Sequence, residues 1–254
     1  MMIPFELIEE YPFVDVQEEE YKRLLGYPND REFEGRVQEL ATWARQWYQQ
    51  HGKPWVYARQ ADEITIHSER VEIEGTTFQP GKLAARLKQA EASSVLLVAM
   101  SAGRECEETA RKLWDEGKPD EYFFLEVYGS AVVEQLVAST SFRLCEWADQ
   151  QDAAILPHYS PGYPGWDITE QAQLLNLMMR SNGLAFRQRI GVLESGMLQP
   201  KKSLLAVFGI TRRVGIAPRL TEFIPCEHCS QRSCRYRRAP QKRHLPRFED
   251  VRSL

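Results

Sequence analysis

Apolar side chains recur along the chain with spacings that separate helical from extended segments. Five of them lie three or four residues apart, as on one face of an amphipathic helix: Phe33, Val37, Leu40, Ala44 and Trp47. Asn29 or Asp30 stands ahead of this run as a candidate cap, and Gly52-Lys53-Pro54 follows it as a stop signal. We predict a helix here that docks by its apolar face.

Other segments have the patterns of strands. A short strand is predicted over 55–59, and apolar residues alternate on both sides of His67-Ser68, which indicates a hairpin over 64–73 with one solvent-facing side. The apolar run 94–100 predicts a central, buried strand. Two further strands are expected over 190–193 and 203–210.

Helices are also predicted over 81–90, 104–116, 119–150 and 168–180. Helices and strands therefore occur in a mixed order rather than in strict alternation. This order favours an α+β fold, with a mixed or antiparallel twisted sheet flanked by helices, over a doubly wound sheet. We assign 1–225 to this domain, with a helical and hairpin part over about 1–92, and 226–254 to a basic, cysteine-rich tail.

Composition is that of a soluble globular protein, since 43% of the 254 residues are hydrophobic and 27% are charged. No run approaches the roughly 18 apolar residues of a membrane span. The amino terminus lacks the basic start and apolar core of a signal peptide. We therefore expect a cytoplasmic protein without membrane association.

Charge is distributed unevenly along the chain. The whole chain has a formal charge of −4, whereas 226–254 holds eight basic and three acidic residues, a net +5, which leaves −9 on 1–225. A basic tail can indicate nucleic-acid binding. The acidic body would repel phosphates and no nucleic-acid fold signature is present, so we do not expect a nucleic-acid partner. Hydrolase, Walker and dinucleotide-binding motifs are also absent from the sequence.

The segment 157–166 reads Pro-His-Tyr-Ser-Pro-Gly-Tyr-Pro-Gly-Trp. Its prolines and glycines disfavour a regular ladder or helix, so its backbone groups are open to another molecule. Its aromatic rings add flat apolar faces beside those polar groups. This combination suits a planar, polar ligand such as an adenine nucleoside, although an aromatic packing loop has the same composition.

Pro161-Gly162-Tyr163-Pro164 resembles the Arg-x-x-x-Gly-Tyr-Pro segment of the reactivation domain of cobalamin-dependent methionine synthase. The run 194–203, Glu-Ser-Gly-Met-Leu-Gln-Pro-Lys-Lys-Ser, resembles that family's Thr-Glu-Ser-x-x-Met-x-Pro-x-x-Ser. A weaker match is 129–134, Gly-Ser-Ala-Val-Val-Glu. The matches span about residues 120–210, and the chain length is closer to the small stand-alone relatives of this domain.

The resemblance implies a methionine synthase activation domain-like fold and an S-adenosylmethionine site. The residues implied to line that site are Glu134, His158, Ser160, Gly162 and Tyr163. His158 stands where the family has arginine, and histidine is a weaker and pH-dependent cation. If His158 holds the ligand's carboxylate, affinity is expected to fall as pH rises through its pKa. The resemblance identifies no catalytic residue.

The function that the resemblance implies is that of an accessory protein in a cobalamin (corrinoid) methyltransferase system. S-adenosylmethionine would serve the reductive remethylation of cobalamin carried by a partner, because the corrinoid-binding modules are absent from this chain. The partner would be a cobalamin-binding protein or a methionine synthase without its own reactivation domain, together with an electron donor. Methyl transfer is expected only with that partner. An alternative is a purely structural protein that keeps this fold but has lost the ability to bind the ligand.

Three cysteines crowd into the tail: Cys226, Cys229 and Cys234. Their spacing in a reducing compartment indicates an iron–sulfur cluster or zinc more than a structural disulfide. A fourth ligand could be His244, Cys106 or Cys145. A Cys226–Cys229 redox pair and inert thiols remain open. The alternative function is therefore an Fe–S or zinc redox or binding module that delivers electrons to a corrinoid protein without methyl transfer.

Overall fold

The computed structural model describes residues 5–180, 188–213, 225–228, 234 and 236–240. It is organised by a five-stranded sheet with the order β1-β2-β6-β10-β7. All four strand pairs are antiparallel. The strands are β1 (Glu6–Glu10), β2 (Trp55–Ala61), β6 (Ser94–Ser101), β10 (Ser203–Thr211) and β7 (Ala154–Ile155).

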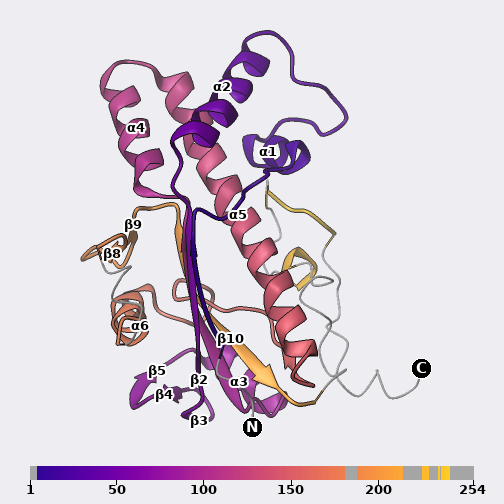
Figure 1. Cartoon of the computed structure of the whole chain (residues 1–254), viewed down its shortest axis with the longest axis vertical. Coiled ribbons are helices and arrows are strands. Elements are labelled where there is room, and N and C mark those ends of the chain that lie inside the picture. Colours follow the sequence, from indigo (N-terminus) through magenta and orange to yellow (C-terminus); the bar gives the residue numbers. More distant parts are fainter. Residues whose placement is uncertain (1–4, 181–187, 214–224, 229–233, 235, 241–254) are drawn as a thin grey trace.

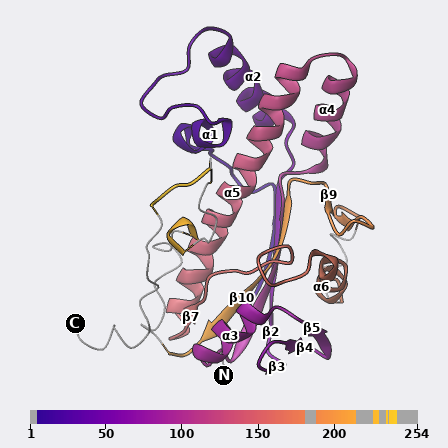
Figure 2. The ribbon, with the colours of Figure 1, turned by 180° about the vertical axis from the view of Figure 1, so that it is seen from behind.

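Helices cover one face of this sheet, which Figure 1 shows nearly edge-on. They are α1 (Glu18–Leu25), α2 (Gly35–His51), α4 (Arg104–Asp115) and the long α5 (Pro119–Asp149). The reverse view in Figure 2 shows α5 running along the full length of the sheet. Its first turn carries Pro119, Asp120 and Glu121, residues that suit a helix start because proline needs no donor there and carboxylates favour the positive end of the helix dipole.

Smaller elements cover the opposite face. They are α3 (Gly81–Gln89), η1 (Ile168–Glu170), α6 (Gln171–Met178), the three-stranded sheet β3 (Ile64–Ile66), β4 (Val71–Ile73) and β5 (Thr76–Phe78), and the hairpin of β8 (Gly191–Val192) and β9 (Leu198–Gln199). A short 3₁₀ helix, η3 (Pro225–His228), belongs to the carboxy-terminal segment. Among the described helices, none combines the length and apolar character needed to cross a bilayer.

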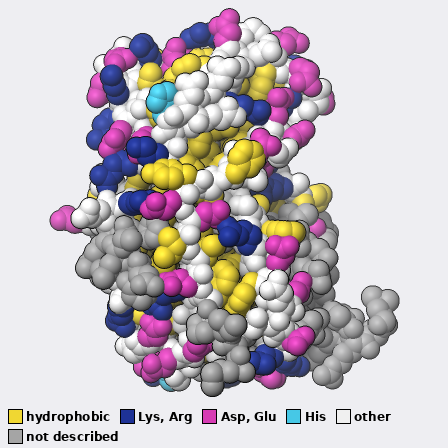
Figure 3. All heavy atoms as spheres, in the orientation of Figure 1, with side chains coloured by type: hydrophobic (Ala, Val, Ile, Leu, Met, Phe, Trp, Pro, Cys, Tyr) yellow, Lys and Arg dark blue, Asp and Glu magenta, His cyan; other side chains and the backbone are white. Residues whose placement is uncertain are grey.

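Strand β6 explains why the core has two halves. Leu96, Val98 and Met100 pack against the helical layer, whereas their neighbours Val95, Leu97 and Ala99 pack against the α3–α6 side. All six are fully buried. Successive side chains of a strand point to opposite faces, so a strand covered on both faces has to be apolar throughout. The surface in Figure 3, by contrast, intersperses hydrophobic, acidic and basic side chains.

The expected α+β class and antiparallel sheet are confirmed. The predicted helices and strands correspond to α2, α3, α4, α5, α6, β2, β3, β4, β6, β8 and β10. The predicted cap of α2 is wrong, because Arg31 N donates to Pro28 O in a turn that uses Asn29 and Asp30 before the helix begins. Sequence patterns missed the short elements α1, β1, β5, β7 and β9.

Gly129 lets three segments approach one another closely. A Cβ atom at this position of α5 would lie 2.8 Å from Cys106 Sγ on α4 and 3.2 Å from Cγ of Lys202. Cys106 is completely buried, so it has little room to move. The weak sequence match at 129–134 thus begins on a residue with a packing role.

We expect Gly129→Ala to destabilise the protein by about 1–3 kcal/mol, because the added methyl overpacks this contact. Thermal unfolding followed by circular dichroism measures the change. Gly35→Ala is not a clean control because its φ of +52° adds strain, so Gly191→Ala, which meets no atom within 4 Å, serves instead. Equal melting temperatures for Gly129→Ala and wild type would contradict the packing role.

Candidate functional site

The proline-rich loop folds as two consecutive tight turns. Tyr163 N donates to Ser160 O at 3.0 Å, and Trp166 N donates to Tyr163 O at 2.9 Å. Each turn has proline at its second position and glycine at its third, with φ of +91° at Gly162 and +88° at Gly165. This is the arrangement of a type II turn, which requires positive φ after the proline. The Pro-Gly pairs therefore determine the local shape of the loop.

Strand β10 fixes where the loop lies. Tyr159 exchanges two backbone hydrogen bonds with Val207, both of 2.9 Å, and so continues the edge of the sheet beyond β7. Its ring stacks on Trp166 with an interplanar angle of 5°. Both side chains are buried, and the indole Nε1 of Trp166 donates to Glu170 at 2.6 Å. Tyr159 and Trp166 therefore serve as packing residues, as expected if this segment is an aromatic packing loop.

Tyr163 differs from these two aromatics because 39% of its surface is exposed. Its hydroxyl lies 3.2 Å from His158 Nε2. Burial around the hydroxyl raises the pKa of Tyr163 to about 12, and the negative charge of Glu134 adds to this rise. Tyr163 thus offers an accessible ring face while its hydroxyl stays protonated next to Glu134 and His158.

Ser160 carries the polar groups of the loop that lack a hydrogen-bond partner among the described residues. Its side chain is buried, and its Oγ makes no hydrogen bond of normal geometry with any described residue. That hydroxyl is nevertheless close enough to Tyr163 to oppose part of the rise in the phenol's pKa. The expectation of a wholly open backbone needs correction, because Gly162 N already donates to Trp166 O at 2.9 Å. Gly162 shapes the turn, whereas Ser160 is the unsatisfied group.

His158 is half-buried against Phe208, with the two ring centroids 5.3 Å apart. Burial lowers the pKa of its imidazole to about 4, and the positive charge of Arg86 contributes. His158 is therefore neutral at pH 7. A pH-dependent affinity that depends on this side chain would fall near pH 4 rather than near the ordinary histidine value.

Helix α5 supplies the acidic residue of the site. Glu126, Ser130 and Glu134 follow one another at four-residue spacing and so share one face of the helix. The first two are tied to the segment before β10, because Lys202 Nζ lies 3.3 Å from Glu126 and 2.9 Å from Ser130 Oγ. Lys201 pairs with Glu126 at 2.9 Å. These contacts fix the axial position of α5, and hence of Glu134, relative to β10.

The carboxy-terminal segment reaches the same helix. Arg238 Nη2 lies 3.0 Å from Glu134 on α5 and 2.5 Å from Glu20 on α1. Glu134 thus lies near both Arg238 and Tyr163, and the hydroxyl of Tyr163 lies 3.2 Å from His158 Nε2. The composition of the tail gave no sign that Arg238 would join them.

The three tail cysteines are only partly described. Cys226 and Cys234 are partly buried, and Cys229 and His244 lie outside the described residues. Within the described residues, no group of three or more candidate ligands has the arrangement of a metal site. The metal site at Cys226, Cys229 and Cys234 therefore stays a prediction.

Comparison with solved structures matches this chain to the crystal structure of the MetH reactivation domain bound to AdoHcy, with a TM-score of 0.55 and 13% sequence identity. The match covers 82% of this chain and 78% of that chain. The fold is that of the MetH reactivation domain. No family model and no curated protein matches the sequence.

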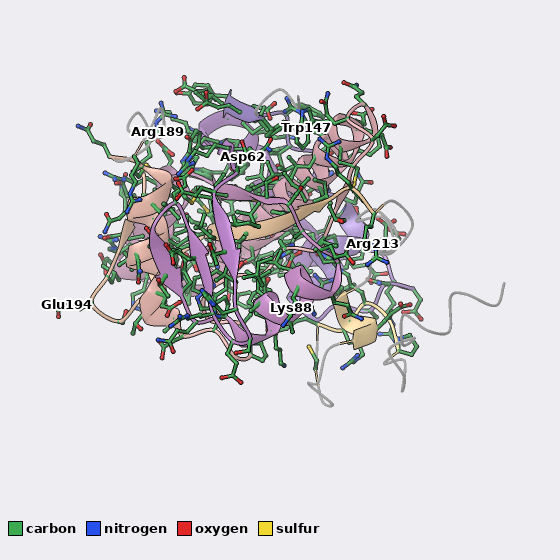
Figure 4. All side chains as sticks on the ribbon, turned by 90° about the horizontal axis from the view of Figure 1, so that it is seen from below. Asp62, Lys88, Trp147, Arg189, Glu194 and Arg213 are labelled. Carbon is green, nitrogen blue, oxygen red and sulfur yellow. The ribbon has the colours of Figure 1, made fainter. Side chains whose placement is uncertain are left out.

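The likeness to the MetH reactivation domain confirms the expected fold and places the sequence matches in one structural frame. The 129–134 match lies on α5, the 161–164 match forms the first tight turn, and 194–203 leads into β10. The 194–203 match has a structural role as well, because Lys201 and Lys202 hold α5 in place through their contacts with its side chains. Glu194 projects from the margin of the molecule in Figure 4.

The lowered pKa of His158 predicts acid sensitivity. The unfolded chain binds a proton near pH 6.5, whereas the folded protein binds it only near pH 4. Stability is thus fully present above pH 6.5 and is lost as the pH falls toward 4, by roughly 3 kcal/mol at most from this group. Denaturant unfolding between pH 7 and 4 measures this loss. A His158→Gln variant should lose less stability over that range, and an identical pH profile would contradict the assignment.

Proposed function

We propose that this protein binds S-adenosylmethionine at the Ser160–Tyr163 turn and assists the reductive remethylation of cobalamin carried by a partner. The observation that carries this proposal is the fold shared with an AdoHcy-bound reactivation domain over 82% of the chain. The local chemistry of the turn supports it independently, because an exposed aromatic ring, an unsatisfied hydroxyl and a carboxylate lie together there.

Each group has a place in that proposal. The exposed face of Tyr163 packs against the ligand, while the Ser160 hydroxyl and backbone N–H supply hydrogen bonds. Ser160 N makes no hydrogen bond with another described residue. Glu134 carries the negative charge that a sulfonium or ammonium group requires. Gly162 keeps the turn free of a side chain, so its backbone can approach the ligand.

This chain would contribute to methyl transfer by positioning the ligand. S-adenosylmethionine supplies a methyl group on a sulfonium, and the partner's cobalamin together with one electron from a donor protein accepts it, leaving S-adenosylhomocysteine. The residues of this chain would hold the ligand in the orientation for transfer and exclude water. The partner and the electron donor belong to this proposal, as does a cytoplasmic location.

Tyr163→Ala should weaken binding of S-adenosylhomocysteine by about 1–3 kcal/mol, through lost packing and a lost hydrogen-bonding group. Isothermal titration calorimetry measures the affinity, and Tyr163→Phe should retain most of the packing contribution. Tyr11→Ala is the control, because that tyrosine is 57% exposed and lies outside the turn. A wild-type protein that gives no heat and no rise in melting temperature at saturating ligand would refute the proposal.

The tail supports a second candidate function, a metal or iron–sulfur module. Arg238 N donates to Cys226 Sγ at 3.3 Å, so this sulfur lies within the folded part of the tail. With Cys229 and Cys234, this sulfur would provide three soft ligands for zinc or an iron–sulfur cluster. An iron–sulfur cluster at this position would be able to pass electrons to a corrinoid protein.

Elemental analysis and visible absorbance of anaerobically purified protein test this candidate. We expect one metal centre per chain, colourless for zinc and brown for an iron–sulfur cluster, and its loss in Cys229→Ser. Ser233→Ala, a substitution in the tail that removes no candidate ligand, is the control. Substoichiometric metal in both the wild type and Cys229→Ser would show that the tail cysteines do not form a metal site.

A further inference from the structure

Arg238 links the carboxy-terminal segment to two helices that lie on one side of the sheet. A single nitrogen of its guanidinium, Nη2, contacts both Glu20 of α1 and Glu134 of α5. Burial acts to raise the pKa of Glu20, but hydrogen bonds from Arg23 and Arg238 hold it below its ordinary value. The guanidinium of Arg238 is therefore shared by two carboxylates.

This arrangement leaves hydrogen-bonding capacity on both sides of the Arg238–Glu134 pair. Nη1 and Nε of Arg238 make no hydrogen bond or ion pair with the described residues, and neither does Oε1 of Glu134. Both side chains are partly exposed, at 37% and 45%. Each of these two nitrogens of Arg238 still has an N–H that can donate to a further acceptor. The pair thus presents single N–H donors of Arg238 beside an open carboxylate oxygen.

Arg86 is another described cation near the loop, and its guanidinium lies over the ring of Tyr159, 5.2 Å from the centroid. His158 is neutral at pH 7, and Lys201 and Lys202 are paired with Glu126. An amino-acid group has an ammonium and a carboxylate on one carbon, so its recognition needs an anion and a cation close together. Glu134 and Arg238 are such a combination, next to the Tyr163 side of the loop.

We propose that Arg238 completes the ligand site by binding the carboxylate of the ligand's amino-acid end while Glu134 binds its ammonium group. This inference rests on the proposed function, since it assigns one end of that ligand. The carboxy-terminal segment is then part of the binding site rather than an appendage. Its turn is held by Cys226, whose carbonyl accepts from Arg237 at 2.6 Å and whose sulfur accepts from Arg238 N.

Two probes separate this role from a general effect on folding. S-adenosylhomocysteine has the amino-acid end, whereas 5′-methylthioadenosine shares its nucleoside and thioether but lacks that end. Calorimetric titration of the full chain with both probes should show Arg238→Ala weakening S-adenosylhomocysteine by about tenfold to hundredfold. The affinity for 5′-methylthioadenosine should stay within about twofold of wild type. Arg238→Lys should give an intermediate loss, because lysine keeps the charge but lacks the planar guanidinium and its additional N–H donors.

Arg36→Ala is a matched control. Arg36 also contacts two carboxylates, Glu39 at 3.2 Å and Glu121 at 2.9 Å, and Glu121 belongs to α5. Glu121 precedes Glu134 by 13 residues, and this separation along a helix is about 20 Å. Removal of Arg36 should leave both affinities unchanged.

The remaining outcomes overturn the inference in distinguishable ways. Equal weakening of both probes by Arg238→Ala would make Arg238 a structural residue of the tail. Tighter binding of S-adenosylhomocysteine would make it a competitor for Glu134, and unchanged binding would place it outside the site. A wild type and an Arg238→Ala variant that bind neither probe would remove the proposed function itself, and this inference with it.

Discussion

The pairing of β10 with β6 is the contact on which the rest of the structure depends. The two strands pair in register from Ser203 opposite Ser101 to Ile210 opposite Ser94. Every residue of β6 is buried, so this strand needs a partner on each edge and a layer on each face. β10 satisfies one edge of β6, and its own outer edge then receives β7 and Tyr159. The same strand thereby completes the core and positions the proline-rich loop 157–166.

The site lies where a locally determined loop meets a long helix. The two Pro-Gly turns would form in many contexts, but their aromatic residues divide into buried packing groups and one exposed tyrosine only after Tyr159 joins β10. α5 is held in register by Lys201 and Lys202, at Glu126 and Ser130. Glu134 lies one helical turn after Ser130, so its position along the helix axis relative to the proline-rich loop is fixed as well.

The electrostatics of the site follow from burial. His158 stands where the methionine synthase family has arginine, and its burial against Phe208 keeps it neutral. A protein with Glu134 alone would hold a net negative site. Arg238 restores a positive charge from a segment far along the chain, and its second carboxylate partner, Glu20, holds it there.

The sequence by itself determined the features that depend on neighbours in the chain. Apolar periodicity defined most helices and strands, and the Pro-Gly pairs defined the turns, because backbone preferences and amphipathic spacing act locally. It failed for β1 and β7, which are short and gain their hydrogen bonds only from distant strands. Only the tertiary structure decided that His158 is neutral, that Tyr159 packs while Tyr163 is exposed, and that Arg238 meets Glu134 across 104 positions. Burial and charge pairing depend on what the folded chain brings together, and no local pattern encodes that.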